Sequence, residues 1–331
     1  MSDVVDNLQK ILGSKFKGKV PTIISGSQLV PTEFVTTGSL ALDWVWGGGL
    51  PIGHGIVIIG KEKSAKSTSC LKMLAQLQAA GHSCAWIDAE NTLDKDWAKL
   101  HKVNLDNLAV YSVGPGESAE YVLEIARETL SAGYFVFLDS IAVLESEEAM
   151  KKKEDKGYAG KTYAGASAPI TSFCADIGKI LRPKNVSLII VNQLRDNMSI
   201  YGARTRTPGG RALKHMATIM TEFTQGDYIE GAGGEKIGVE VKFFCNKNKV
   251  RKPFRERLYE LYFSAGINPL KEVIDFAVYY ELLEARGSWM YYEGEQLGQG
   301  ANQVMGYLVK NQDVYKILRA QIVELIKENK R

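Results

Sequence analysis

The chain has 331 residues, of which 45% are hydrophobic and 24% charged, so it can bury a large core and is not a disordered protein. No stretch approaches the roughly 18 consecutive apolar residues that a membrane-spanning helix needs, and the amino terminus lacks the pattern of a secretory leader. The net charge is +3, from 41 basic and 38 acidic residues, and this balance alone neither favours nor excludes a nucleic-acid partner.

The first predicted element is a short helix near the amino terminus. Its apolar stripe at helical spacing consists of Val4, Val5, Leu8, Ile11 and Leu12. Residues 13–19 contain glycine and lysine and have no apolar period, which is typical of a flexible connection. We therefore expect a short helical segment that is tethered to the rest of the chain.

The central part of the chain alternates short apolar runs with helical patterns. Five runs have the length and composition of buried strands: residues 56–59, 84–88, 134–139, 187–192 and 239–244. Strands that alternate with helices form mainly parallel sheets that are covered on both faces. The pattern predicts an α/β fold with a mainly parallel central sheet.

Two central stretches and the carboxyl-terminal part differ from this pattern. Residues 145–166 and 194–210 are rich in Gly, Lys, Arg and Thr and have no clear period, so we expect long functional loops there. After Ile267 the pattern changes to a helix, a short Trp/Tyr-rich segment and a final helix. This order predicts a small α+β domain at the carboxyl terminus.

The cysteines bear on the cellular compartment. They lie far apart, each among apolar neighbours, and none forms a C-x-x-C pair: Cys70, Cys84, Cys174 and Cys245. This usage is typical of reduced core residues, and we expect a cytoplasmic protein.

A phosphate-binding loop is predicted at residues 60–67, which read G-K-E-K-S-A-K-S between an apolar strand and a helical run. In such a loop the backbone N–H groups and a helix amino terminus point at phosphates, Lys66 reaches the β and γ oxygens, and Ser67 binds Mg²⁺. Ala65 replaces the usual second glycine, which is a modest change only if its φ is negative. The competing interpretation is a solvated lysine-rich turn.

Acidic residues follow two of the predicted strands. Asp139 ends the 134–139 run and could hold Mg²⁺ through water, whereas Glu90 follows the 84–88 run and could orient an attacking water. An isolated acidic residue after a strand is more often a helix cap. Their order after the phosphate loop favours the catalytic interpretation.

These features belong to a longer series of motifs that resembles the RecA family of strand-exchange recombinases. The series covers nearly the whole chain, in the order V-T-T-G-S-L-A-L-D (35–43), G-G-G-L-P-I-G (47–53), the phosphate loop, I-D-A-E-N-T-L-D (87–94), F-L-D-S (137–140), V-N-Q-L-R (191–195), G-G-R-A-L-K (209–214), N-K-N-K (246–249) and G-I-N-P-L-K-E-V-I-D (266–275). The resemblance implies a RecA-type P-loop ATPase core over residues 34–267. It also implies an N-terminal oligomerisation segment over residues 1–33 and a C-terminal α+β domain over residues 268–331.

The resemblance assigns roles at the ATP site. It implies that Glu90 is the catalytic carboxylate, that Asp139 is the Walker B residue, and that Gln193 senses the γ-phosphate and couples ATP to DNA. Asp94 and Trp97 would embrace the adenine, with an aromatic ring from Tyr262 or Phe263 on its other side. The nucleotide-binding residues expected in this way are Gly60, Glu62, Lys63, Ser64, Ala65, Lys66, Ser67, Thr68, Asp94, Trp97, Tyr262 and Phe263, with Ser67 and Asp139 for Mg²⁺.

The resemblance also implies that Lys247 and Lys249 reach the ATP of a neighbouring subunit. Cations supplied across an interface neutralise transition-state charge and couple hydrolysis to assembly. Without the resemblance, lysines that keep an exposed strand edge soluble would be the better interpretation.

Two basic clusters are candidate DNA contacts that the modest overall charge conceals. Residues 193–214 carry a net charge of +4 and coincide with the second DNA loop of the family, and residues 242–257 carry +6. Apolar or aromatic side chains can hold stretched bases apart, although ordinary loop anchoring is the alternative for them. The expected DNA-binding residues are Tyr163, Arg195, Met198, Ile200, Arg204, Arg206, Gly209, Gly210, Arg211 and Lys242.

We therefore expect an ATP- and Mg²⁺-dependent recombinase that forms a helical filament on single-stranded DNA and pairs it with homologous double-stranded DNA. Two alternatives use the same fold. A hexameric RecA-fold helicase or DNA motor would share the ATP residues, but the G-G-R-A-L-K loop argues against it. A DNA-binding regulator with a decayed ATPase would not need Lys66, Ser67, Glu90 and Asp139.

Overall fold

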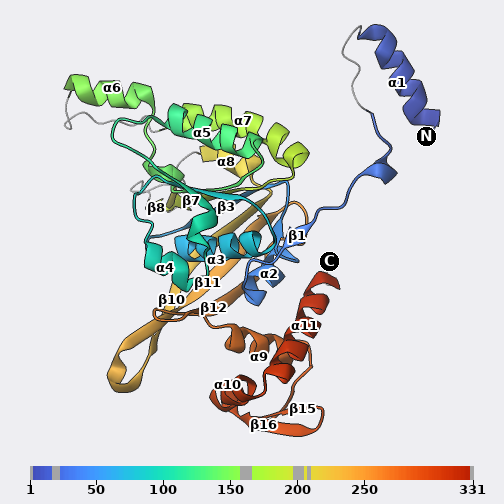
Figure 1. Cartoon of the computed structure of the whole chain (residues 1–331), viewed down its shortest axis with the longest axis vertical. Coiled ribbons are helices and arrows are strands. Elements are labelled where there is room, and N and C mark those ends of the chain that lie inside the picture. The colour runs from blue at the N-terminus through green and yellow to red at the C-terminus, as the bar shows by residue number, and fades with distance from the viewer. Residues whose placement is uncertain (1–2, 17–22, 157–165, 197–204, 207–209, 329–331) are drawn as a thin grey trace. The chain divides into compact units, whose positions relative to one another are not determined.

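The computed structural model describes residues 3–16, 23–156, 166–196, 205–206 and 210–328 (Figure 1). The chain divides into two compact units, Met1–Glu33 and Phe34–Arg331. The first unit contains helix α1 (Asp3–Lys15), which confirms the predicted helix, and a 3₁₀ turn at Gly26–Gln28. Its residues Val4, Leu8 and Ile11 are exposed, at 76%, 42% and 53% of their full areas, whereas Val5 is 8% exposed, so the unit covers only part of its apolar stripe.

A nine-stranded sheet organises the second unit. The strand order is β13-β12-β11-β10-β3-β7-β6-β4-β5, in which β10 to β5 are parallel neighbours and β10 to β13 are antiparallel neighbours. The strands are β3 (Gly55–Gly60), β4 (Cys84–Asp88), β5 (Leu108–Ser112), β6 (Phe135–Asp139), β7 (Leu188–Gln193), β10 (Ile219–Glu230), β11 (Lys236–Asn248), β12 (Glu256–Tyr262) and β13 (Gly266–Ile267). The mainly parallel sheet and all five predicted strands are confirmed, although β11 is longer than its apolar run.

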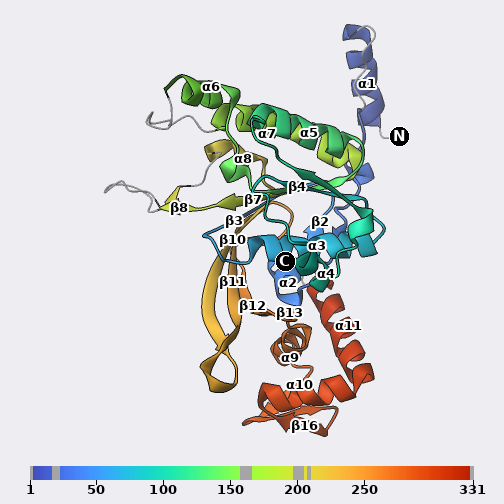
Figure 2. The same ribbon diagram turned by 60° about the vertical axis from the view of Figure 1, so that its left-hand side comes forward.

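Helices cover both faces of the parallel strands, which explains why those strands read as continuous apolar runs. Figure 2 shows α5 (Ala119–Ser131) and α7 (Ser167–Lys184) on one face, and α3 (Lys66–Ala79) on the other. Every residue of β3, β4 and β6 is buried. The rings of Trp86 and Phe137, on the neighbouring strands β4 and β6, stack with centroids 5.8 Å apart. They are two of the largest buried side chains of this core.

The prediction of loops at residues 145–166 and 194–210 is partly wrong, because both ranges contain regular elements. Residues 147–156 form helix α6 (Glu147–Lys156), which has acidic residues in its first turn and an i,i+4 ion pair between Lys152 and Glu148. Within 194–210, β8 (Arg195–Asp196) pairs antiparallel with β9 (Thr205–Arg206), and α8 (Gly210–Met216) begins at the last residue. Helix α6 shows no apolar period because its sequence is strongly polar. The cysteines are free, but Cys174 is only half-buried.

The carboxyl-terminal residues form the predicted small α+β domain. It contains α9 (Pro269–Tyr279), a three-stranded sheet of β14 (Glu284–Arg286), β15 (Trp289–Tyr292) and β16 (Glu295–Gln299), and the helices α10 (Gly300–Lys310) and α11 (Gln312–Glu328) (Figure 1). Two helices therefore follow the Trp/Tyr-rich segment where one was predicted, because α10 ends at its C-cap Asn311 and α11 begins at Gln312.

The remaining regular elements frame the core. They are the pair β1 (Phe34–Val35) and β2 (Leu50–Pro51), helix α2 (Leu40–Trp46) and helix α4 (Lys95–Leu100). Within the described parts of the chain, every helix is too short or too polar to cross a lipid bilayer.

A buried carboxyl group joins the C-terminal domain to the core. Glu272 of α9 is 4% exposed, and its carboxylate accepts hydrogen bonds from the Ser39 hydroxyl and from the backbone N–H groups of Leu40 and Ala41. These donors belong to the amino terminus of α2, so Glu272 completes the cap of that helix. Burial, assisted by the nearby Asp43 carboxyl, raises the pKa of Glu272 to about 7.

This pKa predicts a pH-dependent contribution to stability. The folded chain holds the Glu272 proton more tightly than the unfolded chain, so stability is lost as the pH rises from about 4.5 to about 7. Glu272→Gln keeps an acceptor but cannot ionise. The free energy of unfolding of the unmutated protein relative to this variant should therefore fall by roughly 3 kcal/mol between pH 4.5 and pH 8 in urea titrations. A difference that does not change with pH would contradict the assignment.

Candidate nucleotide site and DNA-contacting surface

The phosphate loop lies at the carboxyl end of β3, between that strand and α3, as its motif predicts. A Cβ atom at Gly60 would lie 2.3 Å from the Phe223 carbonyl oxygen, so this position needs glycine. Lys63 and Ala65 have φ angles of 61° and 60°. Ala65 is therefore in the left-handed region, and its replacement of glycine costs the loop about 1–2 kcal/mol of conformational energy.

Lys66 is folded into its own loop. The ammonium group donates a hydrogen bond to the Lys61 carbonyl oxygen at 2.6 Å, and the side chain is buried. Burial lowers the pKa of Lys66, whereas the carboxylates of Asp139 and Glu90 favour its charged form. The ammonium group also donates to the Ser64 hydroxyl at 3.4 Å, and a buried cation whose partners are neutral oxygens can exchange them for phosphate oxygens, so the loop fits a polyphosphate.

The carboxyl ends of β4 and β6 bring the acidic residues together. Asp88 and Asp139 are paired in register, and the Ala89 N–H donates to the Asp139 carbonyl at 2.7 Å. The Asp139 carboxylate also accepts a hydrogen bond from the Ser67 hydroxyl. Burial, together with the carboxylates of Glu90 and Asp88, raises the pKa of Asp139 to about 6. This excess of buried negative charge beside a hydroxyl fits a divalent cation.

Asp88 has a separate task that sequence reasoning missed. Its carboxylate accepts hydrogen bonds from the backbone N–H groups of Thr92 and Leu93, at 3.2 and 2.8 Å. These bonds fold the 89–93 loop over the end of β4 and so hold Glu90 near the phosphate loop. The acidic residue directly after a buried strand was the available signal.

Glu90 and Gln193 meet across the strand ends. The Gln193 side-chain amide, at the end of β7, donates a hydrogen bond to the Glu90 carboxylate at 2.6 Å. Both expected residues therefore lie at the edge of the sheet that carries the phosphate loop. β8 follows Gln193 after one residue, so the amide connects this edge to the start of the 194–210 segment.

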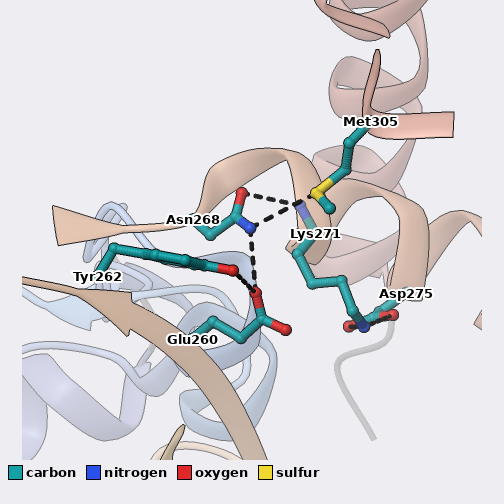
Figure 3. Close-up of polar contacts among 6 residues, drawn as sticks. All are labelled: Glu260, Tyr262, Asn268, Lys271, Asp275 and Met305. Carbon is teal, nitrogen blue, oxygen red and sulfur yellow. Dashed lines mark hydrogen bonds and ion pairs between the residues drawn. The ribbon is translucent and has the colours of Figure 1, made fainter. Parts of the chain in front are cut away.

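The residues expected around the base lie on two elements. Asp94 is the N-cap of α4 and accepts from the Trp97 backbone N–H at 2.7 Å, and the Trp97 indole N–H donates to the Thr68 hydroxyl at 3.2 Å. This contact brings the indole to the first turn of α3. Tyr262 ends β12, and Figure 3 shows its hydroxyl donating to the Glu260 carboxylate, at 3.2 Å. Phe263 is 45% exposed.

Lys247 and Lys249 lie at the opposite edge of the sheet from the phosphate loop of their own chain. Lys247 pairs with Met220, which pairs with Val57 near the amino end of β3. Their ammonium groups donate to the carbonyl oxygens of Lys214 and His215 at the end of α8, the second at 2.9 Å. Cations are favourable at a helix carboxyl terminus. In the single chain these lysines therefore cap α8.

The structure describes part of the expected DNA-contacting set. Arg211 is exposed in the first turn of α8, and Gly210 begins that helix with a φ of 58°. The Lys242 ammonium lies on the exposed face of β11, 3.8 Å from the Glu240 carboxylate. Arg195 and Arg206 are partners in the register of the β8–β9 ladder. The other members lie outside the described residues: Tyr163, Met198, Ile200, Arg204 and Gly209.

A metal ion at this site would need ligands beyond the protein. In the described ranges, no three His, Cys, Asp or Glu side chains are grouped as a metal cage. Ser67 and Asp139 can hold Mg²⁺, which binds few protein groups and keeps waters and phosphate oxygens as its other ligands. Bound there with a nucleotide, the ion would neutralise the charge of the phosphates.

The chain is similar to known proteins, both to a family and to individual relatives. The family models for the RecA N-terminal and C-terminal domains match residues 3–268 and 271–327. The chain is 36% identical to Protein RecA of Acinetobacter baylyi over 297 residues, which is 88% of this chain and 82% of the relative. It is 32% identical to Protein RecA of Thermus aquaticus over 97% of this chain and 93% of the relative, and 32% identical to that of Mycoplasma mobile over 99% and 98%.

The contact between Glu90 and Gln193 generates a prediction. Glu90→Gln keeps the size of the side chain but removes the charge that a general base needs. We expect nucleotide affinity to stay within about threefold and turnover at saturation to fall by about 10²-fold or more, measured by equilibrium binding and steady-state hydrolysis. If Glu90 is only a helix cap, turnover should stay intact while the melting temperature changes.

Proposed function

Because this chain belongs to the RecA family of ATP-dependent DNA recombinases, we propose that its strand-end site binds ATP together with Mg²⁺ and couples ATP hydrolysis to filament formation on single-stranded DNA. The family function is homologous pairing and strand exchange, and a hexameric helicase is not favoured. The observation that carries the proposal is the convergence of Lys66, Asp139, Glu90 and Gln193 at one edge of the sheet.

The proposed division of labour follows from the positions of the side chains. The backbone of residues 60–67 and the Lys66 ammonium bind the phosphates, and Ser67 with Asp139 binds Mg²⁺. Glu90 orients the attacking water and accepts its proton. Gln193 holds the Glu90 carboxylate through the bond of 2.6 Å until its amide turns to the γ-phosphate. Asp94, Trp97 and Tyr262 bind the base.

Gln193 is also the proposed link between ATP and DNA. Its amide can exchange the Glu90 carboxylate for a γ-phosphate oxygen, and such an exchange would move the end of β7. The basic 194–210 segment begins at the next residue, so the movement reaches the candidate DNA contacts directly. The β8–β9 ladder that positions Arg195 and Arg206 is the element that the phosphate would bias.

Lys247 and Lys249 support a site shared between subunits. They lie about 10 Å along the strand direction from the end of β3, and two strands away, which puts a further 10 Å or so between them and their own phosphate loop. Their ammonium groups also point at α8. Two lysines that act on ATP from there must act on the ATP of another subunit.

The N-terminal unit is the proposed oligomerisation segment. The exposed residues Val4, Leu8 and Ile11 recur along one side of α1, and an amphipathic helix with exposed apolar residues along one side is suited to packing on another chain. The connection to the second unit would let this helix reach a neighbouring subunit.

Electron microscopy with single-stranded DNA and a non-hydrolysable ATP analogue tests the whole proposal. We expect helical filaments that require both the DNA and the analogue. Closed rings would favour a helicase, and isolated particles on DNA would favour a regulator without filament formation.

The shared site predicts complementation between two inactive variants. Lys247→Ala/Lys249→Ala should bind ATP through its own loop but lose DNA-stimulated hydrolysis, and Lys66→Ala should lose hydrolysis because its phosphate loop lacks the ammonium group. In a mixed filament, intact loops of the first variant meet intact lysines of the second. Hydrolysis should therefore return in part, to about a quarter of the normal rate at equal amounts if subunits mix at random and each interface acts independently.

The control for complementation is co-assembly. Each variant carries a different fluorophore, and energy transfer between them reports mixed filaments. If the filaments mix and hydrolysis does not return at any ratio, the shared site is refuted. Lysines that contact DNA phosphates instead would lower DNA affinity and reduce its salt dependence.

A further inference from the structure

The His101 side chain lies between the two elements that carry the aromatic residues of the proposed base site. His101 is the C-cap of α4 and is 2% exposed. Its ring packs edge-on against the Trp97 indole, with centroids 4.8 Å apart and an interplanar angle of 72°. This is the favoured edge-to-face geometry of aromatic pairs.

The other side of the imidazole meets the end of the sheet. A Cβ atom placed on Gly266 would lie 3.0 Å from His101 Cε1 and 3.3 Å from Nδ1, so the backbone of β13 approaches the ring directly. Gly266 pairs with Tyr262 across the β12–β13 ladder. One buried ring thus separates the Trp97 indole from the strand end that carries Tyr262.

The chemistry of the imidazole indicates that it acts by packing. Nε2 is buried and has no hydrogen-bond partner among the described residues. Burial, with the nearby Lys72 ammonium as a second cause, lowers the pKa of His101 to about 4, so the ring is uncharged at neutral pH. In the described part of the chain, Nε2 therefore makes no polar bond by which His101 would hold a loop.

The two aromatic walls are anchored independently on their far sides. The Trp97 indole N–H donates to Thr68 on α3. The Tyr262 hydroxyl donates to Glu260, whose carboxylate also accepts from the Asn268 side-chain amide at 3.1 Å; the same amide contacts the Met305 sulfur at 3.5 Å (Figure 3). Neither anchor determines the distance between the walls. The His101 ring contacts the Trp97 indole on one side and the Gly266 backbone on the other.

We propose that His101 is a positioning residue for the nucleotide base: it spaces the Trp97 indole from the Tyr262–Gly266 strand end and so sets the width of the slot that takes a purine. This inference rests on the proposed ATP-binding function, and it adds a residue that would never touch the nucleotide. Aromatic faces held at stacking distance contact a larger area of a purine than of a pyrimidine, and so favour purine nucleotides.

Two substitutions separate spacing from simple filling of the core. His101→Phe keeps a planar ring, whereas His101→Leu keeps apolar volume but removes the edge-to-face contact. We expect His101→Leu to raise the KM for ATP about twofold to tenfold, with kcat at saturation within about twofold of normal, and to reduce the preference for ATP over CTP. His101→Phe should keep the KM within about twofold of the unmutated protein.

Inorganic tripolyphosphate is the probe that isolates the base slot. It occupies the phosphate loop without a base, so calorimetry should give the same affinity for the unmutated protein and for His101→Leu. His82→Ala is the matched control, because His82 also contacts an aromatic ring, that of Phe135, but lies at the opposite end of β4. His82→Ala should leave the KM for ATP and the KM for CTP unchanged.

The outcomes distinguish this inference from the function on which it rests. An unmutated protein that neither binds nor hydrolyses ATP would overturn both. Normal hydrolysis with an unchanged KM in His101→Leu, accompanied by a lower melting temperature, would make His101 a core residue and overturn this inference alone. Equal losses of ATP and tripolyphosphate affinity would also overturn it, since the phosphate loop would then be the part disturbed.

Discussion

The parallel alignment of β3, β7, β6 and β4 is the constraint on which the site depends. Neighbouring parallel strands end at the same edge of a sheet, so the loops that follow them lie close together. The phosphate loop, Gln193, Asp139 and Glu90 follow these strands in turn. Burial of these strands keeps their ends in register. The side chains at these ends are therefore held in fixed positions by the core.

The same burial decided how much could be predicted from the sequence. β3, β4 and β6 are buried on both faces, so each is a continuous apolar run that marks its own position. β5 lies at the sheet edge with every residue at least partly exposed, and β10 carries Gln225, Gly226 and Asp227 in its outer half. Such strands are specified by their partners rather than by local composition, and neither was predicted.

The site shows a similar division between local and distant information. The positions of Lys66, Ser67 and Asp139 at the strand ends could be predicted because each occupies a fixed place in a short motif. The cap that Lys247 and Lys249 form on α8 could not, since it joins residues more than thirty positions apart. The contact of Glu272 with the amino terminus of α2 and the contact of His101 with Gly266 also join residues that are far apart in the sequence. Their side chains carry no local pattern, because the fold alone makes them neighbours.

The cap on α8 has a consequence for the way in which salt acts on assembly. A subunit that turns Lys247 and Lys249 toward a neighbour leaves the last carbonyls of α8 to water, so one ion–dipole interaction is lost for each ion–phosphate interaction gained. Dissolved ions screen both interactions. In the proposed filament, the response to ionic strength would therefore reflect the difference between two screened contacts. It should be weaker than a count of the lysines alone would suggest.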